Sequence, residues 1–233
     1  MESVILAGGL GTRLLPYTMF MPKPMLPLGE KPLLEHIIEW NAQHGINDII
    51  LCISYLGKMI QDYFGDGERF GVSIRYAASR KPLATAGQLG TAAGMVSDTF
   101  VCMYGDSTYD FDLREMIHRH REGGAFITIG LHEHHSSIPY GVIDTDDGGR
   151  VVAWREKPKT VSQINMGCYV MEPGVMSYIP PGKPWGMDAV VRSAMEDGRT
   201  VLGHLGRGNF RDVGTYAAYM DASREYRERL GEI

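Results

Sequence analysis

The sequence lacks most of the features that mark secreted or membrane-spanning proteins. It has only three cysteines in 233 residues, Cys52, Cys102 and Cys168, and none belongs to a CxxC or Cys/His metal pattern. Because all three lie in apolar runs, we interpret them as buried thiols of a protein in a reducing compartment. No apolar run approaches the length of a membrane span, and the N-terminus has no charged leader region. We therefore expect a soluble cytoplasmic protein that contacts no membrane.

The chain also lacks a sustained run of basic residues. Its 23 Lys and Arg are outnumbered by 28 Asp and Glu, which gives a formal net charge of -5. This balance gives no electrostatic footprint for nucleic-acid binding, so an anionic ligand would need a local basic site. The cluster His132, His134 and His135 is placed in a loop. With no second cluster at ligand spacing, it is interpreted as surface histidines rather than a metal site.

Short apolar runs alternate with helical patterns through roughly the first 130 residues. Such alternation is typical of an α/β fold whose mostly parallel, Rossmann-like sheet is joined by crossover helices. Strands are predicted at 3–7, 48–54, 72–77, 99–105 and 125–131, with a helix at 32–45. From Tyr140 the pattern changes to a hairpin across 146–149 and a further strand at 165–172. This predicts a small β-rich insertion, followed by closing helices.

The segment "VILAGGLGTRLLPYTMFMPKPMLPL", residues 4–28, carries the first candidate site. A strand that runs into a glycine-rich turn suits phosphate, because backbone amides can approach the oxygens without a Cβ in the way. The dinucleotide pattern fails at Leu14, and the chain has no G-K-[ST] of a P-loop. Arg13 follows the turn, and Lys23 is held between Pro22 and Pro24. Two positioned cations beside free amides favour a polyphosphate ligand.

These residues and six further segments resemble the sugar-1-phosphate nucleotidylyltransferases, also called nucleotide-sugar pyrophosphorylases. The resemblance begins with "LAGGLGTRLLPYT" and "PKPMLPLGEKPLLEH" and continues in order to the end of the chain. The later segments are "KPLATAG" (81–87), "YGDSTYDFDL" (104–113), "YGVI" (140–143), "WREKP" (154–158), "NMGCYV" (165–170) and "FRDVGTYAAY" (210–219). The resemblance implies a single domain over residues 1–233. Residues 1–134 would mainly bind nucleotide, 135–185 would mainly bind sugar phosphate, and 186–233 would supply closing helices and the second metal-ligand strand.

The resemblance also implies roles for individual residues. Asp106 and Asp212 would hold Mg²⁺, a hard cation whose remaining positions phosphate and water can fill. Arg13, Lys23 and Lys157 would be catalytic by neutralising and orienting the phosphates, with no nucleophilic side chain. The nucleotide would contact Leu6, Ala7, Gly8, Gly9, Gly11, Thr12, Ala86, Gly87 and Gln88. The sugar would contact Tyr140, Gly141, Glu156, Asn165, Gly167 and Asp188.

The choice of substrates stays open at this point. The thymidylyltransferase branch has glutamines where this chain has Pro24 and Gly87, so GTP is slightly favoured over UTP, CTP and dTTP. The chain resembles the short members of the family, acting on mannose, heptose or N-acetylmuramate 1-phosphates, as a monomer or homodimer. Two alternatives are kept: a cytidylyltransferase for a phosphorylated alcohol such as phosphocholine, and a non-catalytic regulatory subunit that senses nucleotide-sugar.

Overall fold

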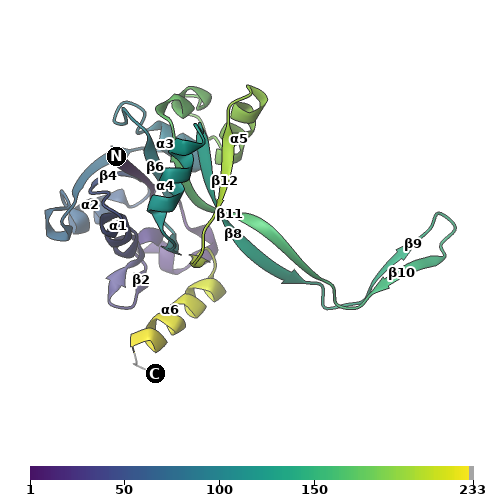
Figure 1. The fold of residues 1–233 in the computed structure, drawn as a ribbon. Helices are drawn as coiled ribbons and strands as arrows, with labels where there is room; N and C mark the ends of the chain where they lie inside the picture. Colours follow the sequence, from purple (N-terminus) through teal and green to yellow (C-terminus); the bar gives the residue numbers. More distant parts are fainter. Residues whose placement is uncertain (231–233) are drawn as a thin grey trace.

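The computed structural model describes residues 1–230 and has one central sheet of seven strands (Figure 1). The strand order is β12-β8-β11-β6-β1-β4-β5, and only β11 runs antiparallel to its neighbours. The strands are β1 (Glu2–Leu6), β4 (Asp48–Ile53), β5 (Ser73–Ala78), β6 (Phe100–Tyr104), β8 (Ile127–Ser137), β11 (Lys159–Met171) and β12 (Val201–Leu205). The predicted mostly parallel α/β fold is confirmed.

Alternate residues of the central strands bury two opposite faces of the sheet. On β1, Ile5 belongs to one apolar cluster, whereas Val4 and Leu6 belong to the other. The first cluster packs under α1 (Leu33–Gln43), α2 (Gly57–Phe64) and α4 (Leu113–Glu122), and the second under α3 (Ala84–Gly90) and α5 (Met187–Glu196). Helices on both faces are the expected cover for a parallel sheet.

Three two-stranded sheets, several short 3₁₀ helices and a last α-helix complete the described part of the chain. The sheets pair β2 (Pro27–Leu28) with β3 (Lys31–Pro32), β7 (Ser107–Asp110) with β13 (Asn209–Asp212), and β9 (Val142–Thr145) with β10 (Val151–Arg155). The 3₁₀ turns are Thr12–Leu14, Tyr17–Met19, Lys23–Met25, Glu68–Phe70 and Pro173–Tyr178. The last helix, α6 (Tyr216–Leu230), packs Ala222 against Leu28, Leu33 and Val213. No helix within 1–230 is long and apolar enough to cross a membrane.

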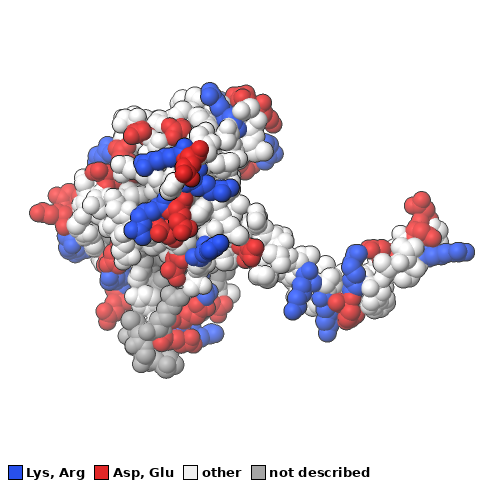
Figure 2. Space-filling view, viewed as in Figure 1, with Lys and Arg blue, Asp and Glu red and all other residues white. Residues whose placement is uncertain are grey.

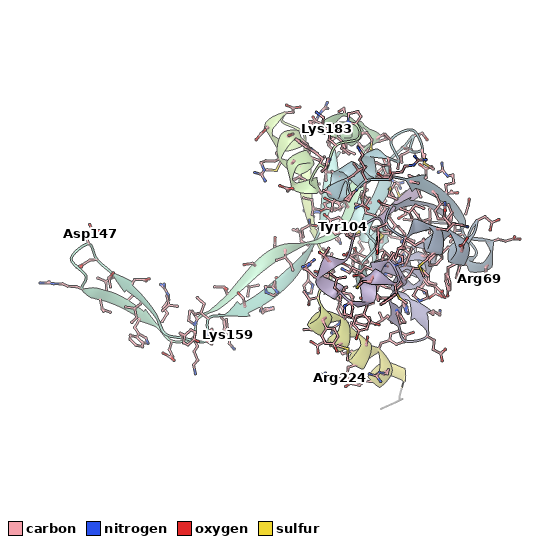
Figure 3. All side chains as sticks on the ribbon, turned by 180° about the vertical axis from the view of Figure 1, so that it is seen from behind. Arg69, Tyr104, Asp147, Lys159, Lys183 and Arg224 are labelled. Atoms are coloured by element: carbon pink, nitrogen blue, oxygen red, sulfur yellow. The ribbon has the colours of Figure 1, made fainter. Side chains whose placement is uncertain are left out.

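A long ribbon projects from the body of the molecule (Figure 1). We call residues 132–165 the arm. Its inner half is the ladder between β8 and β11 from Leu131↔Asn165 to Ser137↔Lys159, and its outer half is the hairpin β9–β10. The stretches 138–141 and 156–158 link the two halves, and we call them the arm junction. In Figure 3, Tyr104 lies where the arm meets the body, Lys159 lies at the join between the two halves of the arm, and Asp147 lies at its tip.

The structure corrects one local expectation and confirms another. His132, His134 and His135 are not in a loop: they are residues of β8, paired with Ile164, Ser162 and Val161 of β11. The hairpin predicted across 146–149 is present, and Asp146 Oδ1 accepts from the amides of Gly148 and Arg150 at 3.0 and 2.9 Å. All three cysteines are buried and free, and burial raises the pKa of Cys52 to about 12.

Candidate active site

The glycine loop follows β1 and leaves three consecutive amides without an acceptor among residues 1–230. The amide of Ala7 donates to the Cys52 carbonyl at 2.8 Å, and that of Gly8 donates to Gln88 Oε1 at 2.8 Å. In the described part of the chain, no acceptor is found for the amides of Gly9, Leu10 and Gly11. A run of free amides in a tight loop forms an anion-binding concavity.

Gly11 is the position where this loop requires glycine. Its φ of +63° lies in the left-handed region, and a Cβ there would come 2.7 Å from Thr18 Cγ2 and 3.3 Å from Lys23 Cβ. The hydroxyl of Thr18 also donates to the Gly11 carbonyl at 2.9 Å. The close approach therefore fixes the loop against the stem of Lys23.

Lys23 lies between two carboxylates at the end of the sheet. Its Nζ is 2.6 Å from Asp106 Oδ2 and 3.8 Å from Asp212 Oδ1, and its side chain is only 7% exposed. Asp106 follows β6, at the carboxyl end of a central parallel strand, where open α/β sheets bind their ligands. A buried lysine needs such partners, because an unpaired buried charge is costly.

The short ladder between β7 and β13 brings the two aspartates together. Asp212 is the register partner of Ser107, and the amide of Val213 donates to the Asp106 carbonyl at 3.1 Å. Two residues far apart in the sequence thus become neighbours through main-chain hydrogen bonds, which position their side chains independently of any ligand.

Arg13 reaches the same place from the glycine loop. A Cβ on Gly214 would lie 2.7 Å from Asp212 Oδ1 and 3.1 Å from Arg13 Nη2. The missing side chain of Gly214 therefore makes room for both groups. The predicted residues Arg13, Lys23, Asp106 and Asp212 form one cluster of two cations and two anions.

This cluster borders a cleft of about 580 Å³. The cleft also includes Gly8, Gly9, Gly11, Thr12 and Gln88 from the sequence prediction. Leu6, Ala86 and Gly87 are buried behind it and do not line it. Gly87 is held closely by the segment before α5, because a Cβ there would lie 2.6 Å from the Lys183 carbonyl oxygen.

A second hollow of about 420 Å³ lies beyond the start of α3, where Thr85 follows the cleft residue Ala84. It contains the predicted sugar-site residues Asn165 and Asp188, and it has a polar lining of Thr85, Tyr104, Tyr169 and Arg192. Asp188 pairs with Arg192 at 3.0 Å.

Two tyrosines and an asparagine form a hydrogen-bonded group in this hollow. The hydroxyls of Tyr104 and Tyr169 lie 3.2 Å apart, and Asn165 Nδ2 donates to Tyr169. Burial raises the pKa of both tyrosines, so they stay protonated and can donate hydrogen bonds. Asn165 Oδ1 accepts from the amide of Gly167 at 2.8 Å.

Gly167 fixes the base of the arm. It has a φ of +72°, and a Cβ there would lie 2.4 Å from the Tyr104 ring. It lies in the irregular stretch where the β11 register with β8 shifts, between Asn165 and Tyr169. Gly167, predicted as a sugar contact, therefore shapes the backbone beside the hollow. Any side chain at this position would collide with the Tyr104 ring.

Three predicted sugar-site residues and the predicted catalytic residue Lys157 lie on the arm and not in the cleft of the same chain. Tyr140, Gly141, Glu156 and Lys157 are all at the arm junction, beyond the ladder of β8 and β11. They form a group there: a Cβ on Gly141 would lie 2.8 Å from the Trp154 ring, and Trp154 Nε1 donates to Glu156 Oε2 at 3.2 Å. Lys157 has a φ of +43°, a left-handed conformation that is strained for lysine.

The carboxylates of the cleft fit a magnesium ion that shares its ligands with a phosphate. No group of three or more His, Cys, Asp or Glu within 1–230 could hold a metal by itself. The carboxylates of Asp106 and Asp212 nevertheless both lie near the Lys23 ammonium, at 2.6 and 3.8 Å. They therefore form a pair of neighbouring oxygen donors. Mg²⁺ commonly binds through one or two carboxylates plus substrate phosphates, so this donor set suits it.

Several residues near these hollows were not found by sequence reasoning. Leu10, Pro82, Leu83, Ala84 and Pro184 line the cleft, and Thr85, Tyr104, Tyr169 and Arg192 line the second hollow. All of these residues except Pro184 and Arg192 lie inside the motifs quoted above, so their position is a usable signal. Arg192 lies on an ordinary amphipathic helix and gives no such signal.

Comparison with known proteins agrees with this geometry. Residues 2–229 match the family model described as "Nucleotidyl transferase". The chain belongs to this family. It is 35% identical over 229 residues to mannose-1-phosphate guanylyltransferase of Mycobacterium tuberculosis, covering 96% of this chain and 64% of that protein. It is 38% identical over 207 residues to UTP--glucose-1-phosphate uridylyltransferase of Synechocystis, covering 79% of this chain and 52% of that protein.

The chain thus spans between half and two thirds of the length of these two curated relatives. A Bacillus anthracis structure described as a glucose-1-phosphate thymidylyltransferase superposes with a TM-score of 0.79 at 26% identity, over 98% of this chain and 96% of that one. The structure of HddC from Yersinia pseudotuberculosis, complexed with GMP-PN, has a TM-score of 0.76 at 24% identity. It covers 97% of this chain and 99% of that one, and shows the fold alone.

Proposed function

We propose that this protein transfers a nucleotidyl group from a nucleoside triphosphate to a sugar 1-phosphate, giving a nucleotide-sugar and pyrophosphate. The observation that carries the proposal is Lys23, buried beside Asp106 and Asp212 at the end of a glycine loop with three free amides. Such a cluster suits a metal-bound polyphosphate, because it supplies amides, cations and oxygen ligands within one cleft.

The triphosphate occupies the cleft in this proposal. The free amides of Gly9, Leu10 and Gly11 bind phosphate oxygens, and Arg13 and Lys23 balance their charge. Gln88 holds the start of the loop through Gly8, so its contribution to nucleotide binding includes the shape of the loop itself. Leu6, Ala7, Ala86 and Gly87 support the nucleotide site from behind.

Asp106 and Asp212 are the proposed ligands of Mg²⁺. When bound, the ion offsets the repulsion between the carboxylates and the phosphates and polarises the phosphoryl oxygens. Without it, the two carboxylates would cancel the charge of Arg13 and Lys23. The cluster would then offer little net attraction to a polyanion.

The reaction needs no nucleophilic side chain. An oxygen of the sugar 1-phosphate attacks the α-phosphorus, and the bond from that phosphorus to the bridging β-phosphate oxygen breaks. Lys23 and Arg13 stabilise the charge that grows on the α-phosphoryl oxygens and on the departing pyrophosphate. Lys157 orients the sugar phosphate, so catalysis depends on positioning and electrostatics.

The sugar phosphate is proposed to lie in the second hollow, against Asn165 and Asp188, and to be contacted by the residues of an arm junction, which in one chain lies away from this hollow. GTP is the proposed nucleotide, and two relatives support it. The mycobacterial relative is a mannose-1-phosphate guanylyltransferase, and a Campylobacter jejuni relative, 34% identical over 73% of this chain and 76% of that one, is a heptose 1-phosphate guanylyltransferase. The Synechocystis relative makes UTP the principal competitor.

A pyrophosphate-release assay tests the proposal. The purified chain is incubated with Mg²⁺, each of GTP, UTP, CTP and dTTP, and mannose, heptose, glucose or N-acetylmuramate 1-phosphate. We expect turnover that requires both substrates and is fastest with GTP. Phosphocholine with CTP serves as the comparison for transfer to another phosphorylated alcohol. The absence of turnover with every sugar phosphate would contradict the proposal.

A further inference from the structure

The arm cannot complete the cleft of its own chain without breaking its ladder. The junction residues Glu156 and Lys157 lie beyond the paired stretch that runs from Asn165↔Leu131 to Lys159↔Ser137. At a strand rise of roughly 3.3 Å per residue, this stretch holds them about 20 Å from the base of the arm. Figures 1 and 3 show it directed away from the body. Bending at the junction would move only the hairpin β9–β10.

The base of the arm does not offer a hinge either. Gly167 packs against the Tyr104 ring so closely that a Cβ would lie 2.4 Å from it, and Asn165 bonds to both Tyr169 and the Gly167 amide. These contacts hold the direction in which β11 leaves the sheet.

The arm also exposes several large apolar side chains to solvent. Trp154 is 64% exposed and Tyr140 is 73% exposed. Ile138, Ile143, Val151, Val152 and Val161 are exposed as well. An isolated two-stranded ribbon is only marginally stable in water, and contiguous exposed apolar groups mark interaction surfaces. The arm therefore has the character of a segment that packs on another surface.

The charge of Lys157 indicates which surface fits the arm junction. Basic and acidic side chains both lie along the arm (Figure 2), and Arg155 is paired with Asp144, but Lys157 forms no ion pair among the described residues. The second hollow of the body offers the exposed carboxylate of Asp188, and Arg192, the only cation lining it in the described part of the chain, is already paired with that carboxylate. The arm junction therefore carries a cation, Lys157, without an ion pair among the described residues, whereas the described lining of the second hollow has no unpaired cation.

We infer that two copies of this chain exchange arms, so that the junction of one copy closes the active site of the other. In this dimer, Lys157 and Glu156 of each copy complete the second hollow of its partner, and Trp154 and Tyr140 are buried between the copies. A reciprocal exchange has two-fold symmetry and closes on itself, as in domain swapping. The assignment of the sugar site rests on the proposed function, whereas the exchange of arms rests on the geometry.

Complementation between two inactive variants tests the exchange. Lys157→Ala disables only the arm and Asp106→Asn disables only the cleft. The two chains are co-expressed with different tags and purified through both tags, with the wild-type pair treated identically. We expect each variant alone to lose at least about 100-fold in rate. The mixed dimer should recover about half of the wild-type rate, because one of its two sites combines an intact cleft with an intact arm.

A mixed sample no more active than its separate variants, next to an active wild type, would overturn the exchange. Arg150→Ala, in the turn at the arm tip, is the matched control for Lys157→Ala and should remain active. The exchange has a second readout that does not need the reaction. Light scattering should give twice the 25.9 kDa mass of one chain. Trp154→Asp should shift the particle to the mass of one chain.

A wild-type chain that is monomeric at assay concentration would overturn the exchange whatever its activity. A dimer that Trp154→Asp dissociates, but that turns over no nucleotide and sugar phosphate, would instead contradict the proposed function alone.

Discussion

Lys23 and Asp106 are 83 positions apart in the sequence, and their side chains meet at 2.6 Å. The lysine is fixed by the turn Lys23–Met25 and the aspartate by the end of β6, so neither depends on a flexible loop. Asp212 lies 3.8 Å from the same ammonium. This contact defines the point where nucleotide, metal and sugar phosphate are proposed to meet.

Replacing the lysine should abolish most of the activity while the fold is retained. Lys23→Met removes the ammonium and leaves Asp106 and Asp212 without it. We expect the pyrophosphate-release rate to fall by roughly 100-fold to 1000-fold, as for loss of one preorganised transition-state donor. Lys58→Met, on the exposed face of α2, should leave the rate unchanged. Equal rates for both variants would remove Lys23 from the mechanism.

Removing either carboxylate should weaken the response to magnesium. In Asp106→Asn or Asp212→Asn, the Mg²⁺ concentration for half-maximal rate is expected to rise at least about tenfold, because a direct ligand is lost. Asp110→Asn, on the exposed side of β7, provides the control. If the magnesium titration curves of all three variants overlay that of the wild type, the assignment of Asp106 and Asp212 as metal ligands is wrong.

Ala84 is a site where glycine should stabilise the protein. Its φ of +54° is a left-handed conformation, in which a Cβ is unfavourable. We expect Ala84→Gly to raise the free energy of unfolding by roughly 0.5 to 1 kcal/mol, since relief of strain exceeds the entropy cost of glycine. Ala42→Gly, inside α1, should lower it by a similar amount. Urea denaturation measures both, and a loss at Ala84 would contradict the strained backbone.

Two glycines separate backbone strain from steric conflict. Gly167 and Gly149 have φ values of +72° and +79°, but only Gly167 has a ring within contact of a Cβ. Gly149→Ala should cost roughly 1 kcal/mol and Gly167→Ala roughly 3 kcal/mol of unfolding free energy. Gly167→Ala should also raise the KM for the sugar phosphate, because Asn165 bonds to the Gly167 amide. Equal costs would mean that the Tyr104 ring can move aside.

His204 should make the fold sensitive to mild acid. Burial lowers its pKa below the ordinary value of about 6.5, so the folded state favours the neutral ring. Above the pKa of the ring in the unfolded state, about 6.5, His204 does not reduce the free energy of unfolding. As the pH falls below that value, the unfolded state binds the proton more readily than the folded state, and the free energy of unfolding decreases. The fall in unfolding free energy between pH 7.5 and 5.5 should be smaller in His204→Asn than in the wild type. If the free energy of unfolding fell equally in the variant and the wild type, groups other than His204 would cause the acid sensitivity.

The sequence was sufficient for the fold and for the four charged residues at the cleft, but not for their contacts. Alternating apolar runs predict β1, β4, β5 and β6, because strands buried on both faces leave a strong pattern. The positions of Arg13, Lys23, Asp106 and Asp212 were available from motifs. Their convergence depends on the ladder between β7 and β13, two short strands whose pairing has no signature in composition.

The arm shows where pattern reasoning fails. "HEHHSS" has no alternation of apolar and polar residues, because a two-stranded ribbon has solvent on both faces. The pattern therefore predicts a loop, although the segment is the continuation of β8. The same misreading hid the distance between the arm junction and the cleft. Sequence can group residues by resemblance, but it does not say whether they meet within one chain.

The most direct test of the account follows the phosphate groups of the nucleotide. The chain is given GTP labelled at the α-phosphate or at the γ-phosphate, together with Mg²⁺ and its best sugar 1-phosphate. Attack at the α-phosphorus predicts that the α-label appears in the nucleotide-sugar and the γ-label in pyrophosphate. Transfer of the γ-label to the sugar, or its release as single phosphate, would show a kinase or a hydrolase and contradict the account.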